Sequence, residues 1–385
     1  MSFLILYKYY FWISCVIILL NMSACKNKAE PPVHQPTAYE LTIPFGFPTI
    51  LNIPDDNPFT VEGIRLGRYL FYDGRLSGRT HPDSLMSCSS CHIQANNFEA
   101  GIDHPVFAGG FVHGLNGQQT HHVVLPLVNL VWNRSGYGWN GFLYPQNDKP
   151  DYRNLEDFVR LAVIAEDEMA GDTTRVKELF QEIEGYPELF FNAFGSNTIT
   201  FLNIQRAIAQ FIRTFVSANS RFDSFLRGEL QLTQSELNGY VLFTTEEGAD
   251  CFHCHGGGGN PLFTTHLFYN NGKDTLFSDP FDRFAVTGDP MHKGAYKAPT
   301  LRNVALSGPY MHDGRFATLD DVINYYSHDV KLSPQIDPLM HHVLKGGVQL
   351  TPQEKADLKA FILSLQDNEF LNNPEFSHPG KMPDE

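Results

Sequence analysis

Two short cysteine–histidine motifs are the residues whose types and spacing most clearly imply chemistry. One, CSSCH, covers residues 88–92, and the other, CFHCH, covers residues 251–255. Two thiols separated by two residues can add to the two vinyl groups of one porphyrin, and the histidine that follows can then bind the iron. The spacing therefore predicts two covalently bound c-type haems with His92 and His255 as proximal ligands, attached through Cys88, Cys91, Cys251 and Cys254.

A zinc site and a thioredoxin-like redox pair are the competing interpretations of these motifs. A zinc site would draw on more ligands at mixed spacing, and a redox pair does not need the histidine that follows. The remaining two of the six cysteines, Cys15 and Cys25, lie in the N-terminal segment, so nothing is left for a disulfide framework. The repeated five-residue pattern favours haem attachment.

The sequence predicts that the segments around these motifs, which must hold them in place, are mainly helices. Amphipathic segments follow residues that can cap a helix N-terminus, and the clearest apolar stripe covers 201–215. Convincing strand alternation is scarce. The predicted capping residues are Thr60, Asn154, Thr200, Thr233, Thr318 and Thr351.

The positions of the two motifs predict two cytochrome c-like domains, each wrapped around one haem. We expect an N-terminal domain over residues 45–228 and a C-terminal domain over 229–370, followed by a tail at 371–385. The Gly-rich run after the second motif has no strand or Lys-Ser/Thr pattern beside it, which argues against a phosphate-binding loop.

The N-terminus is typical of an exported protein. An apolar run over residues 11–21 is too short to span a bilayer but fits the apolar region of a signal peptide. It ends just before Cys25, where Ser23 and Ala24 resemble a bacterial lipoprotein cleavage site. We expect a signal over 1–25, lipid attachment at Cys25, a polar tether over 26–44 and a periplasmic location. A plain secretory signal and an uncleaved anchor are the alternatives.

The charge balance excludes one class of partner. The chain has 28 Lys and Arg against 43 Asp and Glu, a formal net charge of −15. A nucleic-acid-binding protein needs basic groups that neutralise phosphates, so no nucleic-acid partner is expected. The acidic surface suits a basic protein partner.

Several motifs in order over residues 45–370 resemble the bacterial di-haem cytochrome c peroxidases and their relative MauG. Besides the second haem motif, the resemblance is carried by residues 66–77 (LGRYLFYDGRLS), 168–170 (EMA), 219–223 (NSRFD), 299–304 (PTLRNV) and 309–314 (PYMHDG). The resemblance implies that hydrogen peroxide reacts at the N-terminal haem, above His92. It also implies that the C-terminal haem, above His255, relays electrons.

The resemblance also implies roles for side chains outside the haem motifs. Glu168 matches the catalytic acid/base of the family, and Trp139 matches a tryptophan between the two haems. The family often has Gln ten residues before the glutamate, where this chain has Phe158. A loop histidine can bind the resting iron in relatives, and the candidates here are His104, His113, His121 and His122.

A calcium ion lies between the haems in relatives. Ser307 and Pro309 offer oxygens for such an ion, but the expected Asn is replaced around Val123. Calcium is therefore an expectation that rests on the resemblance alone. Relatives are often homodimers, which is an expectation of the same kind.

The distal ligand of the second haem distinguishes the subfamilies. Peroxidases place Met fourteen residues after the histidine of the PYMHDG motif, whereas MauG has Tyr there and this chain has Tyr326. A thioether favours ferrous iron, and a phenolate favours ferric or higher states. The remaining thioether candidates are Met291, Met311 and Met340.

Three functions follow from these features. The first is a peroxidase that reduces hydrogen peroxide to water with electrons from a small cytochrome or cupredoxin. The second is a MauG-like enzyme that uses peroxide to oxidise a protein or a small molecule. The third is a di-haem electron carrier without catalysis.

Overall fold

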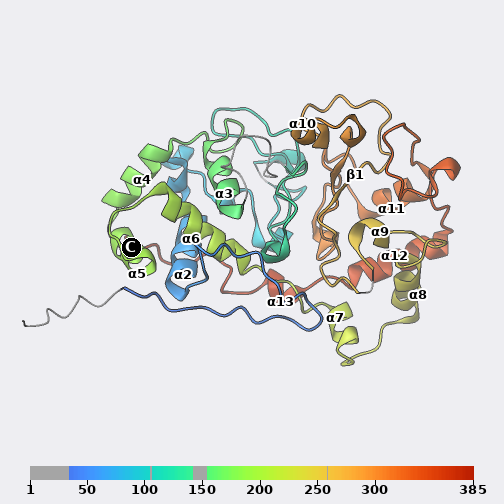
Figure 1. Ribbon diagram of the computed structural model, residues 1–385, viewed down its shortest axis with the longest axis horizontal. Coiled ribbons are helices and arrows are strands. Elements are labelled where there is room, and N and C mark those ends of the chain that lie inside the picture. Colours follow the sequence, from blue (N-terminus) through green and yellow to red (C-terminus); the bar gives the residue numbers. More distant parts are fainter. Residues whose placement is uncertain (1–33, 105, 142–153, 258) are drawn as a thin grey trace, which may run out of the picture. The chain divides into compact units, whose positions relative to one another are not determined.

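The capping residues found in the sequence begin helices in the computed structural model of the protein (Figure 1), which describes residues 34–104, 106–141, 154–257 and 259–385. The side chain of Thr60 accepts a hydrogen bond from the backbone N–H of Gly63. Thr233 and Thr351 each form a complete capping box with the glutamate three residues later. A side-chain cap satisfies backbone donors that a helix start leaves unpaired. The predicted helix starts are confirmed.

The described residues are mainly helical, as the sequence predicts. The α-helices are α2 (Val61–Tyr72), α3 (Leu155–Ile164), α4 (Thr173–Glu182), α5 (Tyr186–Phe194), α6 (Phe201–Arg213), α7 (Arg221–Leu226), α8 (Gln234–Phe243), α9 (Phe252–His255), α10 (Arg283–Thr287), α11 (Leu319–His328), α12 (Pro352–Leu363) and α13 (Asn368–Leu371). The two named strands, β1 (Phe268–Tyr269) and β2 (Tyr296–Lys297), pair antiparallel. Short 3-10 turns join these elements.

Helices α2 and α6 form the centre of the N-terminal half, where they lie side by side (Figure 1). A Cβ atom at Gly67 would overlap the carbonyl oxygen of Ala207, so only glycine permits this close approach. The ring of Phe71 makes edge contacts with Phe211 and Phe215. The amphipathic stripe over 201–215 therefore supplies core side chains. Full burial of each such ring stabilises the fold by roughly 1.5–3 kcal/mol.

Helices α8 and α12 form the corresponding centre of the C-terminal half. A Cβ atom at Gly239 would overlap the carbonyl oxygen of Asp357, which again requires glycine at the helix contact. Phe361 of α12 packs against Phe222 and Phe243, and all three rings are buried. This cluster is distinct from the cluster of the N-terminal half.

The last residues of the chain return to the N-terminal half. Phe376 belongs to the same buried cluster as α2 and α6. Tyr72 donates a hydrogen bond to the carbonyl of Phe376 at 2.7 Å, and Arg75 forms an ion pair with Asp384 at 2.6 Å. Residues 36–385 form one compact unit. The division into two domains stays a prediction.

The predicted export signal, including Cys25, lies outside the described residues. Of the predicted tether, the part from residue 34 onward is described. There Thr37 hydrogen-bonds to Glu62 of α2, and Ala38 pairs with Thr60. Within the described part of the chain, no helix has the length and apolar character needed to cross a membrane.

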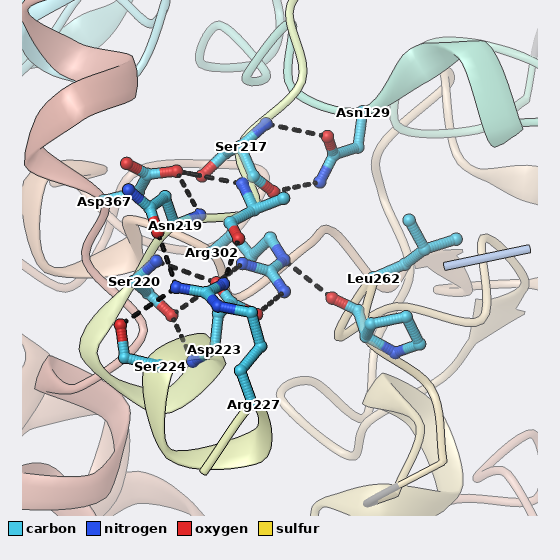
Figure 2. Close-up of polar contacts among 12 residues, drawn as sticks. Asn129, Ser217, Asn219, Ser220, Asp223, Ser224, Arg227, Leu262, Arg302 and Asp367 are labelled. Atoms are coloured by element: carbon cyan, nitrogen blue, oxygen red, sulfur yellow. Dashed lines mark hydrogen bonds and ion pairs between the residues drawn. The ribbon is translucent and has the colours of Figure 1, made fainter. Parts of the chain in front are cut away.

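A buried ion pair lies between α7 and the 299–304 segment (Figure 2). The guanidinium of Arg302 donates to both carboxylate oxygens of Asp223, at 2.8 and 2.7 Å. Its third donor, Nε, bonds to the carbonyl of Pro261 at 2.6 Å, and the rings of Phe47 and Phe263 lie beside it. Burial by itself raises the pKa of Asp223, but Arg302 lowers that pKa below its usual range. Arg302 is thus fully buried, and each of its three guanidinium nitrogens donates a hydrogen bond.

The same segment also connects the two halves of the chain. Asn97, from the N-terminal half, donates to the carbonyl of Arg302 at 3.2 Å, and Asn303 donates to the side-chain oxygen of Asn97 at 3.0 Å. Asn303 Nδ2 also lies 3.2 Å from the hydroxyl of Ser217, which donates to Asp367 (Figure 2). Asn97 and Asn303 both have positive φ, a conformation that asparagine tolerates better than most residues. The polar network therefore joins segments far apart in sequence.

Replacing Arg302 with methionine should reduce the free energy of unfolding by about 3–5 kcal/mol, because it leaves the Asp223 carboxylate buried without its partner. Guanidinium denaturation of the purified protein, followed by circular dichroism, measures the change. The matched control is Lys359→Met, which removes an exposed ion pair with Asp320 and should cost less than about 1 kcal/mol. Equal effects of the two substitutions would contradict this account.

Candidate functional site

The first motif forms a tight turn that fixes its histidine. Cys88 begins the 3-10 turn η3 (Cys88–Ser90), and the backbone N–H of His92 bonds to the carbonyl of Cys88 at 2.9 Å. Nδ1 of His92 lies 2.7 Å from the carbonyl oxygen of Phe98. Since a carbonyl only accepts, Nδ1 carries the proton, and Nε2 is left with a free lone pair.

The second motif repeats this arrangement on different elements. Residues 252–255 form the short helix α9, and Nδ1 of His255 lies 3.1 Å from the carbonyl oxygen of Pro299. A hydrogen bond at Nδ1 is the usual partner of a histidine that binds metal through Nε2. Both motif histidines therefore have the orientation that a haem iron requires.

The protonation states of both motifs also fit haem attachment. Burial lowers the pKa of His92 and of His255 to about 4, so both rings are neutral at pH 7. Burial raises the pKa of the Cys88 and Cys254 thiols to about 12. Redox-active thiols have lowered pKa values instead. The residues present thus fit two haems better than a redox pair.

The second motif opens onto an apolar cavity of about 210 Å³. Cys251, Cys254 and His255 line one part of it, and α11 lines another. Other lining residues include Trp139, Tyr269, Val304, Leu319, Ile323, Val330, Leu339 and Leu350. This composition is typical of a site for a large, flat, apolar group.

Tyr326 of α11 lines this cavity, as a ligand of the second haem would have to. Its hydroxyl accepts a hydrogen bond from Asn271 Nδ2 at 2.9 Å, and the same nitrogen lies 3.7 Å from the sulfur of Met311. Burial raises the pKa of Tyr326 above its usual range, and the hydrogen bond from Asn271 opposes this. Met340 also lines the cavity, whereas Met291 is 56% exposed and does not.

Glu168 lies in the turn after α3, close to the first motif. Burial, and then the neighbouring charge of Asp167, raise the pKa of Glu168 to about 8. Its negative charge in turn raises the pKa of the Cys88 and Cys91 thiols. A half-buried carboxyl group that titrates near neutral pH can both accept and donate a proton.

The backbone around Glu168 is fixed by two other segments. The carbonyl of Glu168 accepts a hydrogen bond from the N–H of Leu115 at 2.9 Å. A Cβ atom at Gly114 would lie 2.5 Å from the carbonyl carbon of Asp167 and 2.8 Å from the nitrogen of Glu168. Helix α3 itself is anchored by the buried ion pair of Glu156 with Arg213 of α6. The position of Glu168 therefore depends on the loop at 113–119 and on α6.

Phe158, which replaces the polar residue expected from the resemblance, is partly buried against the N-terminal core. Its ring stacks on that of Tyr137, with the ring centres 5.8 Å apart. This position supplies packing and no hydrogen bond to peroxide.

The four candidate loop histidines have different surroundings. Both ring nitrogens of His104 are used by backbone groups, since Nδ1 accepts from two N–H groups and Nε2 bonds to the carbonyl of Ser90. Nε2 of His122 lies 2.6 Å from Asp279. The ring of His121 packs against Phe281, and His113 is exposed. His104 and His122 are thus engaged elsewhere.

Trp139 belongs to the N-terminal half but lines the cavity of the second motif. Its indole N–H donates to the carbonyl of Val123 at 2.8 Å, and its ring centre lies 6.3 Å from that of His312. His312 stacks on Tyr296 at 3.5 Å, and Tyr296 donates to Asp279 at 2.7 Å. The sequence gives no signal for this cluster, because its residues come from separate segments.

Comparisons with known proteins match this arrangement. The family model described as di-haem cytochrome c peroxidase matches residues 61–231. The chain is 31% identical over 336 residues to the methylamine utilization protein MauG of Methylophilus methylotrophus, covering 86% of this chain and 91% of that protein. It is 31% identical over 271 residues to the cytochrome c551 peroxidase of Nitrosomonas europaea, covering 69% and 73%.

A solved structure is similar over a comparable length. It is described as a MauG-like protein associated with microbial copper homeostasis. The TM-score is 0.75 at 33% identity, and the match covers 89% of this chain and all of that one.

Replacing Gly114 with alanine should slow the reaction of the haem-loaded protein with hydrogen peroxide by at least about tenfold, because a displacement of Glu168 by a fraction of an ångström misplaces its carboxyl group. Stopped-flow absorbance of the haem bands measures this rate. The control is Gly259→Ala, where a new Cβ meets nothing within 4 Å. An unchanged rate in Gly114→Ala would show that the loop does not position Glu168.

Proposed function

Because the chain belongs to the family of di-haem cytochrome c peroxidases and MauG, we propose that it binds two haems and reduces hydrogen peroxide. Each haem would be attached through its motif cysteines, and Nε2 of His92 or His255 would bind its iron. The free Nε2 of each histidine supports this, since Nδ1 is already bonded to a backbone carbonyl. Each haem defines one cytochrome c-like domain, 45–228 and 229–370.

The observation that carries the proposed reaction is the carboxyl group of Glu168 beside the first motif. The bound haem supplies an iron position for peroxide and the route for electrons. Glu168 accepts the proton from the inner oxygen of peroxide and delivers it to the outer oxygen, which leaves as water. One H2O2, two electrons and two protons give two molecules of water. An electron carrier would not need a carboxyl group with a pKa near 8 at this position.

Trp139 is proposed to pass electrons between the two sites. Its ring lies in the wall of the second cavity although its chain segment belongs to the N-terminal half. A large aromatic ring in this position shortens the gap that an electron must cross. The donor in the cytochrome c peroxidase reaction would be a small cytochrome or cupredoxin, for which the net charge of −15 suits a basic surface.

A MauG-like reaction is the second candidate, and Tyr326 favours it. Tyr326 lines the second cavity, and its hydroxyl accepts a hydrogen bond from Asn271. A phenolate ligand favours oxidised iron, so this haem would store oxidising equivalents better than it accepts electrons. The oxidised substrate would then be a protein or a small molecule.

Calcium, location and assembly stay predictions. Near the proposed calcium oxygens of Ser307 and Pro309, burial raises the pKa of Glu99 well above its usual range, and a hydrogen bond with Ser307 opposes this shift. This places a carboxyl group, a ligand type that calcium prefers, in the same region. The periplasmic location, the lipid anchor at Cys25 and the homodimer rest on the sequence and the resemblance alone.

The peroxidase reaction is tested by measuring the rate at which the haem-loaded protein reduces hydrogen peroxide with reduced cytochrome c. Mass spectrometry should first show the added mass of two haems. Azide or cyanide should change the visible spectrum, because a peroxide site leaves one iron position open. A protein with two haems, no turnover and no spectral response to either anion would be an electron carrier.

Glu168→Gln should lower the rate of reaction with peroxide by about 10²–10⁴-fold, because glutamine cannot transfer a proton. In the unsubstituted protein the ionised carboxylate is the form that accepts the proton. With a pKa of about 8, the rate should rise nearly tenfold per pH unit below pH 8 and level off above it. Glu168→Gln should remove this pH dependence. The control, Glu166→Gln at the exposed neighbouring carboxylate, should keep both the rate and the pH profile.

Tyr326→Met should raise the reduction potential of the second haem by more than about 0.1 V, because a thioether replaces an anionic oxygen ligand. Spectroelectrochemical titration of the purified protein measures the potential. Tyr240→Phe is the control, since Tyr240 packs against Phe361 of the C-terminal core and does not line the cavity. An unchanged potential in Tyr326→Met would exclude Tyr326 as a ligand and weaken the MauG-like candidate.

A further inference from the structure

A group of metal-ligating side chains includes His253, the histidine between the two cysteines of the second motif. We propose that Glu246, His253 and His341 form a binding site for a divalent transition-metal ion that is separate from both haem irons. One ligand atom from each of the three residues lies within 4.8 Å of the others. A single ion placed between them can therefore be reached by all three with small side-chain adjustments.

The geometry of the two imidazoles suits a shared ion. Nε2 of His253 faces the carboxylate of Glu246, with Oε1 at 3.6 Å. The rings of His253 and His341 are 5.0 Å apart and nearly perpendicular. The side chains of Glu246 and His341 are 57% and 38% exposed, so an ion can enter from solvent.

A buried carboxylate sets the orientation of both rings. The side chain of Asp250 is only 6% exposed. One of its oxygens lies 2.6 Å from Nδ1 of His253, and the other lies 3.3 Å from Nδ1 of His341. A metal-binding histidine commonly donates its Nδ1–H to a carboxylate, because this hydrogen bond fixes the tautomer that leaves Nε2 for the metal. Asp250 is thus a positioning residue for two potential ligands.

Three chain segments hold the cluster together. Glu246 follows α8, His253 lies in α9 between the two motif cysteines, and His341 comes from the loop before η9 (Val343–Lys345). Nε2 of His342 bonds to the backbone carbonyl of Glu246 at 2.6 Å and joins the last segment to the first. The site is therefore part of the folded scaffold and not a chance encounter of exposed side chains.

The ligand set indicates the class of ion. Two imidazoles and one carboxylate suit Zn²⁺ or Cu²⁺ better than the harder Mg²⁺ or Ca²⁺. Three protein ligands leave a position for water. Asp250 and His341 also line the apolar cavity, so the ion would lie at the rim of the proposed haem site.

Another group, made of His122, Asp279 and His312, is a weaker candidate. There a single oxygen of Asp279 is already bonded to Nε2 of His122 and to the hydroxyl of Tyr296. The carboxylate occupies the ring nitrogen that would have to bind the metal. In the cluster around Asp250, the carboxylate binds the opposite ring nitrogen and leaves Nε2 available.

Isothermal titration of the haem-loaded, full-length protein with ZnCl2 tests the site. We expect one Zn²⁺ per chain at this site. His341→Gln and Glu246→Gln, which remove a ligand, should each weaken binding at least tenfold, and Asp250→Asn should weaken it about 10–100-fold. The control is His81→Gln, which alters an exposed histidine that also lies near a carboxylate, Asp83 at 3.7 Å, and it should leave the affinity unchanged.

Electron paramagnetic resonance with Cu²⁺ provides an independent readout. The copper signal should show hyperfine coupling to two imidazole nitrogens, and His341→Gln should reduce this to one. The haem absorption bands of each variant report whether it folds and carries its haems, independently of peroxide turnover. Absence of one-to-one binding, or binding that His341→Gln leaves unchanged, would overturn the proposal. Neither outcome would bear on the peroxide reaction.

Discussion

The buried contacts of the 302–303 segment orient both haem motifs. The charge of Arg302 must be neutralised inside the core, and Asp223 does so with two hydrogen bonds. The Arg302 carbonyl and the Asn303 amide both bond to Asn97. Asn97 directly precedes Phe98, whose carbonyl binds His92, and Pro299, whose carbonyl binds His255, lies in the same segment as Arg302. One polar network therefore lies next to both backbone carbonyls that bond to the motif histidines.

The two motifs have the same local chemistry but different surroundings. Each histidine bonds to a backbone carbonyl through Nδ1 and is neutral because it is buried. The first motif lies near the titratable carboxyl group of Glu168, and the second faces an apolar cavity with Tyr326 in its wall. Proton transfer requires the former environment, and storage or relay of electrons suits the latter. The side chains around the two motif histidines thus differ, with Glu168 near the first and Tyr326 near the second.

Residues from both halves of the chain contact one another around the second cavity. Trp139 belongs to the N-terminal half, yet it lines the C-terminal cavity and its carbonyl accepts a hydrogen bond from the N–H of Lys297. His122 in turn pairs with Asp279 across a large separation in sequence. Asp250 and His341 line the same cavity. The cavity of the second motif is therefore lined by residues from both halves.

The sequence by itself determined the helix starts and predicted haem attachment at the two motifs, because a cap such as Thr233 with Glu236 and a five-residue motif are each complete within a few neighbouring residues. It also indicated Glu168 and Tyr326 through the resemblance. Only the tertiary structure decided that Gly114 fixes the backbone of Glu168, that Asn271 bonds to Tyr326, and that Asp250 joins two histidines. These contacts join residues from separate segments that come together only when the chain packs. Local sequence patterns depend on neighbouring residues and therefore cannot predict such contacts.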